Sequence, residues 1–239
     1  MSARPDPPVR KPYDLWTRVW ATYYRLVVIP LTPWTKARQR RVAARACPSM
    51  AGVFRDLDAH CAGGSLTELS CKERLDRGIL DDASLTYGEL EWSSFIGIVD
   101  GLAPRAGETF VELGCGCGQF CFFMNRHHGL KTLGVDKVRC LVGMAAQVAA
   151  QQGLDTAVFQ EGDFLDLDFS LGNIFYVTST CFNEDTMGRL AARFSQAPAG
   201  ARVVSLGRPL RTDTLRLRRR VRCGTSWGRD WAYLYDRLG

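Results

Sequence analysis

From residue 85 onward, apolar positions alternate between helix-like and strand-like spacing. Residues 87–102 carry apolar side chains at helical intervals, and further helix-length segments lie at 119–127, 138–152 and 184–195. Short apolar runs of strand length lie between and after them, at 109–113, 132–136, 156–160, 173–178 and 202–206. Because strands separated by helices pair in parallel, this pattern predicts a parallel sheet covered by helices.

The last segment follows a different pattern. Two segments of strand length, 215–222 and 231–235, flank the glycine-containing stretch 224–228. Two such runs joined by a short turn predict an antiparallel hairpin. The sequence therefore predicts an α/β domain whose parallel sheet is completed by a terminal hairpin.

The region before residue 85 is basic and predicted to be largely helical. A Pro-rich start leads into an amphipathic segment, 13–28, which Pro30 and Pro33 should stop. Residues 36–45 predict a basic helix, and Ser65 followed by Glu68 predicts a capping box for a helix that ends near Arg77. We therefore divide the chain into an N-terminal region, 1–84, and a catalytic domain, 85–239.

Composition narrows the class of protein. With 239 residues, 46% of them hydrophobic, the chain can bury a sizeable core. Its most apolar run, 19–31, contains Arg25 and Pro30 and is too short to cross a bilayer of about 30 Å, so no membrane association is expected. The N-terminus does not read as a secretory signal. The nine cysteines include no Cys-x-x-Cys pair, which favours a reducing compartment and no metal site.

Charge is distributed unevenly along the chain. The net charge of +6 combines +8 in residues 1–46 and +6 in residues 208–222 with −8 in residues 47–207. An acidic body with basic flanks suits a protein that docks on a polyanion or on an acidic protein surface. Solvated basic segments remain the alternative.

A glycine-rich turn follows the first predicted strand. The sequence Phe110-Val111-Glu112-Leu113-Gly114-Cys115-Gly116-Cys117-Gly118-Gln119 leaves a strand and enters a helix. Glycines there permit positive φ and a close approach of the backbone to a ligand. A dinucleotide-binding turn would need glycine where Gln119 stands. The spacing, with Glu112 two residues ahead, instead favours S-adenosylmethionine, whose ammonium and sulfonium call for an acid.

Two further acids follow the next two strands. Asp136 closes the second strand, where a carboxylate can accept hydrogen bonds from ribose hydroxyls. Asp163 and Phe164 follow the third strand, where an acid and a ring suit an adenine. Each feature alone could be a cap, a turn or a core residue, but their order along three strands indicates one nucleoside site.

Taken together, these residues resemble a known family. Tyr87-Gly88-Glu89, the turn 112–119, Gly134-Val135-Asp136-Lys137 and Glu161-Gly162-Asp163-Phe164-Leu165 occur in the order found in the disruptor-of-telomeric-silencing family, the histone lysine methyltransferases without a SET domain. The resemblance covers residues 85–236. It implies a class I methyltransferase fold, which is Rossmann-like with a seven-stranded sheet, and a small helical region ahead of it.

The resemblance also implies roles for individual residues. A loop over the methionine part of S-adenosylmethionine would consist of Tyr87, Gly88, Glu89 and Leu90. The methionine end would be held by Phe110, Glu112 and the turn Gly114, Cys115, Gly116, Cys117, Gly118 and Gln119. The ribose would contact Asp136 with Lys137, and the adenine would contact Asp163 with Phe164. Thr178, Ser179, Phe182, Trp227 and Tyr233 are the candidates that line the acceptor channel.

The acceptor side departs from that family. The family shows Asn-Asn-Phe after the fourth strand, whereas this chain has Thr178-Ser179-Thr180. We expect methylation of a protein lysine, most plausibly in a nucleosomal histone, with RNA or a small molecule as the alternative acceptor and a non-catalytic binding module as a third. Histone methylation would place the protein in the nucleus of a eukaryote, and otherwise the cytoplasm is expected.

A row of arginines marks the first strand of the hairpin. Arg216, Arg218, Arg220 and Arg222 alternate with Leu215, Leu217 and Val221, so a period of two predicts that all four arginines lie on one face. Together with the N-terminal basic residues they could contact nucleosomal DNA or an acidic protein surface. A solubilising guard on a sheet strand is the alternative.

Overall fold

The computed structural model describes residues 29–61, 64–80, 82–86 and 88–239. The chain divides into two compact units, Met1–Gln39 and Arg40–Gly239. Of the first unit, the described part is helical. The segment predicted as a helix at 13–28 lies outside the described residues. No helix of the described part is long and apolar enough to span a membrane.

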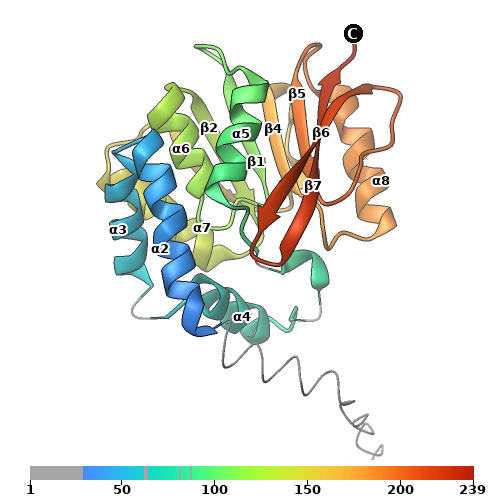
Figure 1. Ribbon diagram of the computed structural model, residues 1–239. Coiled ribbons are helices and arrows are strands. Elements are labelled where there is room, and N and C mark those ends of the chain that lie inside the picture. Colours follow the sequence, from blue (N-terminus) through green and yellow to red (C-terminus); the bar gives the residue numbers. More distant parts are fainter. Residues whose placement is uncertain (1–28, 62–63, 81, 87) are drawn as a thin grey trace, which may run out of the picture. The chain divides into compact units, whose positions relative to one another are not determined.

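Helices precede and cover a mixed sheet (Figure 1). The helices and 3-10 turns are α2 (Ile29–Ala46), α3 (Met50–His60), α4 (Leu66–Asp76), η2 (Ala83–Leu85), α5 (Trp92–Leu102), α6 (Gln119–His128), α7 (Arg139–Gln151), η3 (Phe164–Asp166), η4 (Phe169–Leu171), α8 (Glu184–Arg193) and η5 (Phe194–Gln196). The strands are β1 (Thr109–Leu113), β2 (Lys131–Asp136), β3 (Ala157–Glu161), β4 (Ile174–Thr178), β5 (Arg202–Leu206), β6 (Leu215–Thr225) and β7 (Gly228–Arg237).

The strands of the second unit form one sheet in the order β3-β2-β1-β4-β5-β7-β6. Strands β1 to β5 pair in parallel, β7 pairs antiparallel with β5, and β6 pairs antiparallel with β7 at the sheet edge. This is the Rossmann-like methyltransferase fold with seven strands and a terminal antiparallel hairpin, so the fold predicted from the sequence is confirmed.

Alternate residues of the central strands enter two separate cores. In β4, Ile174 and Tyr176 belong to a core shared with α3, α5, α6 and α7, whereas Phe175 and Val177 belong to a second core with α8. This is the period-two alternation expected of strands buried on both faces. The strands are therefore held from both sides, which fixes the position of the loops at their ends.

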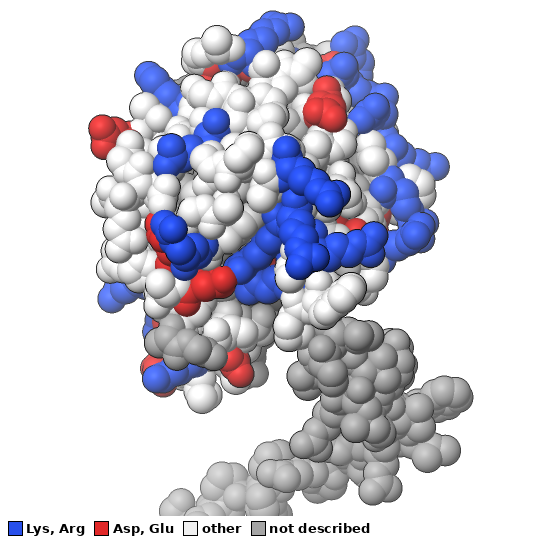
Figure 2. Space-filling view, turned by 60° about the vertical axis from the view of Figure 1, so that its left-hand side comes forward, with Lys and Arg blue, Asp and Glu red and all other residues white. Residues whose placement is uncertain are grey.

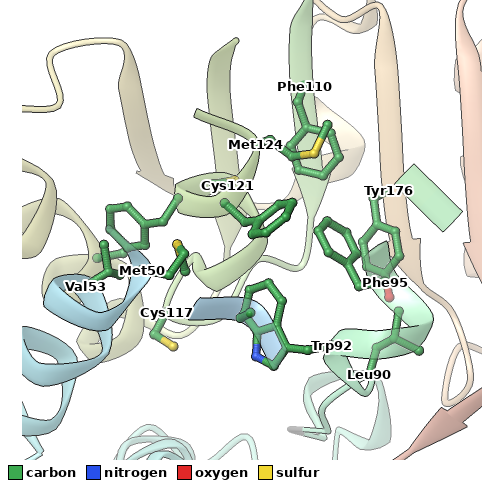
Figure 3. Close-up of a cluster of buried hydrophobic side chains, with 14 of the residues drawn as sticks. Met50, Val53, Leu90, Trp92, Phe95, Phe110, Cys117, Cys121, Met124 and Tyr176 are labelled. Atoms are coloured by element: carbon green, nitrogen blue, oxygen red, sulfur yellow. The ribbon is translucent and has the colours of Figure 1, made fainter. Parts of the chain in front are cut away.

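Aromatic rings dominate the first of these cores (Figure 3). Trp92 packs edge-on against Phe54, Phe95 and Phe120, and the rings of Phe95 and Phe120 stack with centroids 3.8 Å apart. Phe54 comes from α3, so residues 50–60 share the core of the methyltransferase-like sheet. The separate role predicted for residues 1–84 stays a prediction.

Local sequence signals explain several helix boundaries. Ser65 accepts a hydrogen bond from the Glu68 amide while the Glu68 carboxylate accepts one from the Ser65 amide, so the predicted capping box is present at the start of α4. The basic helix predicted from Lys36 begins earlier, at Ile29. Helix α3 was not predicted.

Two predictions near the hairpin were wrong. The helix expected from Tyr87 begins only at Trp92, because Leu90 forms a β-bridge with Thr225 and the Glu91 amide donates to the Gly224 carbonyl. The hairpin strands are also longer than expected, since β6 continues to Thr225 and β7 runs from Gly228 to Arg237.

The four alternating arginines do not share one face, which corrects the expectation from period two. The register between β6 and β7 shifts between Leu217 and Arg219. As a result Arg216 lies on the face of its partner Asp236, whereas Arg220 and Arg222 lie on the face of Tyr233 and Trp231. An extra residue at the bulge, which alternation alone does not reveal, moves the second half of the row to the other face.

Candidate functional site

Three acidic side chains gather at one edge of the sheet. Glu112 stands opposite Gly134 of β2 in the parallel register, and Asp136 stands opposite Glu161 at the end of β3. Asp163 follows two residues later as the N-cap of η3. Because the carboxyl ends of parallel strands meet at one edge, the structure brings together the acids that the sequence places on three strands.

The glycine-rich turn is anchored to the end of β2. The amides of Gly114 and Cys115 donate to the Val135 carbonyl at 2.8 and 3.1 Å, and the Gly116 amide donates to Oδ2 of Asp136 at 2.8 Å. Gly114, Gly116 and Gly118 all have positive φ. The turn therefore adopts a conformation that residues with a side chain reach only under strain.

Gly118 has a second, steric reason to be glycine. A Cβ at this position would overlap the Phe159 ring, which comes from β3 and also lies against Gly134. The Phe159 ring therefore packs against the glycine turn. Sequence reasoning missed this ring, although a glycine inside strand β2 was a signal that something approaches its backbone closely.

Glu112 carries a buried carboxyl group that has no cationic partner among the residues the structure describes. It is 5% exposed and accepts hydrogen bonds from the Cys121 amide and thiol, each at 3.3 Å. Within the described residues it makes no ion pair. Burial raises its pKa to about 8, the Cys121 hydrogen bonds act in the opposite direction, and the nearby Asp136 raises it further. A buried acid of this kind suits a ligand that brings its own positive charge.

Asp136 braces the turn while remaining partly accessible. Besides the Gly116 amide, the Val138 amide donates to its Oδ1 at 2.8 Å. Burial raises the pKa of Asp136, and these backbone hydrogen bonds limit the rise. The side chain therefore connects the glycine turn to the start of α7, and its predicted contact with ribose would use the remaining acceptor capacity.

Lys137 and Asp163 form an ion pair at 2.9 Å. Burial opposes ionisation of Asp163, but the hydrogen bonds from Lys137 and the Leu165 amide outweigh it and lower the pKa of the carboxyl. The neighbouring Phe164 ring stacks on Phe182 with centroids 5.5 Å apart and an interplanar angle of 25°. One predicted adenine residue and one predicted acceptor residue are thus in contact.

The loop 88–90 joins the turn to the hairpin tip. The Glu89 amide donates to Oγ of Ser226, the Ser226 amide donates to the Glu89 carbonyl, and the Gln119 side chain donates to Glu89 at 3.4 Å. A Cβ on Gly88 would lie 2.5 Å from the Trp227 ring. Sequence reasoning assigned loop and hairpin to the site but missed Ser226 as the link. Tyr87 lies outside the described residues.

The remaining acceptor candidates fall in different surroundings. Thr178 ends β4 at the same edge as the acids, and Tyr233 lies on β7 opposite Ser205. Ser179 is fully buried, and its hydroxyl is engaged by the Ser205 hydroxyl, the Leu206 carbonyl and the Arg208 amide. Its hydrogen bonds give Ser179 a packing role, so it is the weakest of the predicted channel residues.

Several of the residues predicted to bind the cofactor are buried in the protein interior. Phe110, Cys115, Cys117 and Leu90 are each at most 6% exposed. Burial raises the pKa of the Cys115 and Cys121 thiols, so both stay neutral. Among the described residues no group of three or more His, Cys, Asp or Glu could hold a metal.

Comparison with known proteins points in the same direction as this geometry. Residues 104–197 match a family model described as a methyltransferase domain. A stretch of 72 residues is 38% identical to a 23S rRNA (uracil(1939)-C(5))-methyltransferase, RlmD, of Shewanella sp. strain MR-4 and covers 30% of this chain. The chain spans only 16% of the length of that relative.

Solved structures share the fold at low identity. TrmN from Thermus thermophilus superposes with a TM-score of 0.52 over 60% of this chain and 48% of its own, at 14% identity. Geranyl diphosphate C-methyltransferase from Streptomyces coelicolor A3(2), solved with S-adenosyl-L-homocysteine, gives 0.51 over 62% and 77% of the two chains, at 15% identity.

The chain contains a class I methyltransferase domain. Its cofactor is S-adenosylmethionine. Glu112 is buried and makes no ion pair with the described residues, and together with the positive-φ glycines, Asp136 and Asp163 it fits a cationic sulfur nucleoside. The geometry of the edge therefore agrees with the family match. The individual contacts assigned to each residue of this methyltransferase stay predictions.

Replacing Gly118 with alanine should destabilise the methyltransferase domain by about 2–4 kcal/mol, because the new methyl group meets both positive φ and the Phe159 ring. Gly143→Ala is the matched control, since this helical glycine has open space around it and alanine there should stabilise by up to about 1 kcal/mol. Urea unfolding measures both. Equal effects of the two substitutions would show that Phe159 does not constrain the turn.

The raised pKa of Glu112 predicts a specific dependence of stability on pH. The folded state holds the proton up to about pH 8, whereas an unfolded Glu releases it near its ordinary pKa of 4.5. The stabilising contribution is therefore complete below the ordinary value and is lost as pH rises through about 8. Between pH 5 and 8 the free energy of unfolding should fall by about 2 kcal/mol or more.

Glu112→Gln removes that ionisation while keeping the shape of the side chain. Asp136 contributes a change of the same sign, so the variant should show a smaller but not absent fall. Urea titrations of both proteins at pH 5, 6, 7 and 8 make the comparison. Parallel pH profiles of the two proteins would contradict the assignment of a raised pKa to Glu112.

Proposed function

We propose that this chain transfers the methyl group of S-adenosylmethionine to RNA. The observation that carries the proposal is the edge formed by Glu112, Asp136 and Asp163, where the buried carboxyl group of Glu112 has no cationic partner among the described residues. An ammonium bound beside Glu112 would favour the ionised carboxylate and pair with it. S-adenosylmethionine contributes an activated methyl on a sulfonium, and the protein has only to bind, orient and exclude water.

The proposed binding roles follow from the geometry. Glu112 would face the ammonium, and the backbone from Phe110 to Gln119 would hold the methionine end. Asp136, with Lys137 beside it, would take the ribose, and Asp163 with Phe164 the adenine. Gly88, Glu89 and Leu90 would close over the methionine part, because hydrogen bonds tie this loop to both the turn and Ser226.

Methyl transfer needs alignment more than acid–base catalysis. An electron pair of the acceptor atom would form the bond to the methyl carbon while the carbon–sulfur bond breaks, with S-adenosylhomocysteine as the leaving group and the acceptor's proton passing to solvent. Holding nitrogen or carbon, methyl and sulfur in line can supply much of the rate enhancement. Thr178, Phe182, Trp227 and Tyr233 are the proposed lining of the acceptor site, with Ser179 supporting them from the interior.

Two findings support RNA as the acceptor. The relative that is 38% identical over 72 residues is named as a 23S rRNA methyltransferase. The hairpin whose tip contacts loop 88–90 carries seven arginines and two aspartates between Leu215 and Arg237, a net charge of +5. A basic element beside the acceptor edge favours an anionic substrate.

Protein lysine, in particular a histone lysine, is the second candidate. The Gly88–Trp227 packing favours it, because an aromatic ring over the loop would help to desolvate an amine. A lysine must lose its proton before attack, which costs about 4 kcal/mol at pH 7.4, and a narrow apolar channel lowers that cost. This function would place the protein in a eukaryotic nucleus, whereas RNA methylation is also compatible with the cytoplasm.

A methyl-transfer assay decides between the candidates. The protein is incubated with S-adenosylmethionine labelled on the methyl group and, separately, with total RNA, free histones, nucleosomes and a small-molecule extract. We expect label in RNA. Label confined to histones or nucleosomes would overturn the RNA proposal in favour of the second candidate, and label confined to the extract would overturn both.

Amide substitutions test the cofactor site in the same assay. Glu112→Gln and Asp136→Asn should each reduce methyl transfer and cofactor affinity at least about tenfold, since each removes a charge-assisted contact. Glu161→Gln is the matched control, because Glu161 lies next to Asp136 in the sheet but pairs with the exposed Arg139. Equal losses in all three variants would contradict the assigned roles.

A further inference from the structure

Strand β6 is the outermost strand of the sheet, and it runs toward the end of the sheet at which the glycine turn and the three acids lie. It pairs antiparallel with β7, which pairs antiparallel with β5, so β6 runs in the same direction as the parallel strands. Its last residue, Thr225, bridges to Leu90 beside the glycine turn. Its first residues lie at the opposite end of the strands, and its eleven residues extend over about 33 Å.

Arginines occupy this strand from one end to the other. Arg216, Arg218, Arg219, Arg220 and Arg222 are all exposed, and Arg229 continues the series at the start of β7. Figure 2 shows lysine and arginine side chains gathered in a continuous patch on one side of the molecule. A cationic surface therefore extends along the whole edge strand rather than over a single spot.

The bulge in β6 spreads these arginines over two faces. The Arg219 guanidinium lies 2.5 Å from the position of a Cβ on Gly101, so it reaches over α5. The guanidinium groups of Arg220 and Arg222 lie over the Trp231 ring, 4.9 and 5.3 Å from its centroid, on the other face. The edge of the sheet is thereby flanked by cations on both sides.

Hollows lie at both ends of the strand. One, of about 460 Å³, is lined by Arg105, Arg202, Arg216 and Arg218 together with Glu108 and Asp236. The other, of about 500 Å³, lies at the cofactor end and includes Arg222, Arg229 and Glu91. Both are open and polar, which suits a charged backbone better than an apolar ligand.

Acidic groups of the protein neutralise only part of this charge. Glu108 is engaged by the buried Arg202, and one carboxylate, Asp236, lies 3.5 Å from both Arg216 and Arg218. Arg219, Arg220 and Arg222 make no ion pair with any described residue. Three guanidinium groups in the middle of the strand therefore remain available for an external anion.

We propose that these arginines form a track that binds the phosphate backbone of single-stranded RNA and leads it from the far edge of the sheet to the acceptor site. The proposal rests on the proposed function and specifies how its substrate is held. Guanidinium forks match phosphate oxygens, and the arginine-stacked Trp231 provides a planar surface of the kind on which bases stack.

The features of the strand favour RNA over an acidic protein. A protein partner would call for an apolar anchor of several side chains, whereas on β6, all of whose residues are described, the exposed large apolar side chain is Leu217 alone and arginines surround it. The arginines also lie on a strand paired into the sheet and not on a projecting helix of the kind with which many proteins read a DNA major groove. Single-stranded RNA is flexible enough to follow the arginines along the length of β6.

The test compares two double variants with equal loss of charge. Arg220→Gln/Arg222→Gln removes two unpaired track cations, and Arg55→Gln/Arg189→Gln removes two exposed arginines from α3 and α8. Fluorescence anisotropy measures binding of a labelled single-stranded 20-nucleotide RNA between about 50 and 200 mM salt. Calorimetry with S-adenosylmethionine and urea unfolding are run on every protein.

The track variant should bind RNA at least about tenfold more weakly, and its dependence of log K on log salt should decrease by about 1.4, the value for two phosphate contacts on a single strand. The control should lose less than about threefold. Cofactor affinity should be unchanged in both. Equal losses in the two variants, or no loss in either, would overturn the track.

Competing ligands test the RNA assignment, and the methyl-transfer assay separates the track from the proposed function. Tighter binding of duplex DNA or polyglutamate than of RNA would overturn the RNA assignment. Methyl transfer to RNA with an unaffected track variant would leave the function standing and remove the track. RNA binding that depends on the track, without any methyl transfer to RNA, would leave the track standing and overturn the proposed function. An unfolded track variant is replaced by Arg220→Lys/Arg222→Lys, which should weaken RNA binding by a smaller factor and keep the salt dependence.

Discussion

The site depends on one buried carboxyl group, that of Glu112, which makes no ion pair within the described part of the chain. A folded chain keeps such a group neutral or provides it with a partner. Here the Cys121 amide and thiol provide hydrogen bonds but no positive charge. The end of β1 is therefore prepared for a cationic ligand, and the glycine turn leaves its backbone accessible at the same place.

The rest of the fold holds this edge in position. Phe159 and the Asp136 carboxylate fix the glycine turn from two sides, and two packed cores fix the strands beneath it. The terminal hairpin then reaches the same edge from the far end of the sheet, because Ser226 is hydrogen-bonded to Glu89. The predicted cofactor side and the predicted acceptor side are thus joined by hydrogen bonds of Ser226 to the Glu89 backbone.

Sequence periodicity predicted the sheet, its terminal hairpin and the three acids, because each depends on local spacing and on the rule that parallel strands end at one edge. It did not predict what depends on contacts between distant segments. The Leu90–Thr225 bridge shortened helix α5, the Phe159 ring came from a neighbouring strand, and the bulge at Arg218 divided the arginine row. None of these leaves a mark in local spacing.

Calorimetric titration with S-adenosylmethionine at pH 7, in buffers of low and high ionisation enthalpy, tests the central claim most directly. Since burial raises the pKa of Glu112 to about 8, the free protein holds its proton at this pH. Binding of a cation beside that carboxyl should release close to one proton, and Glu112→Gln should release markedly less and bind more weakly. A folded protein that binds no cofactor, or binds it equally well with and without this carboxyl, would contradict the account.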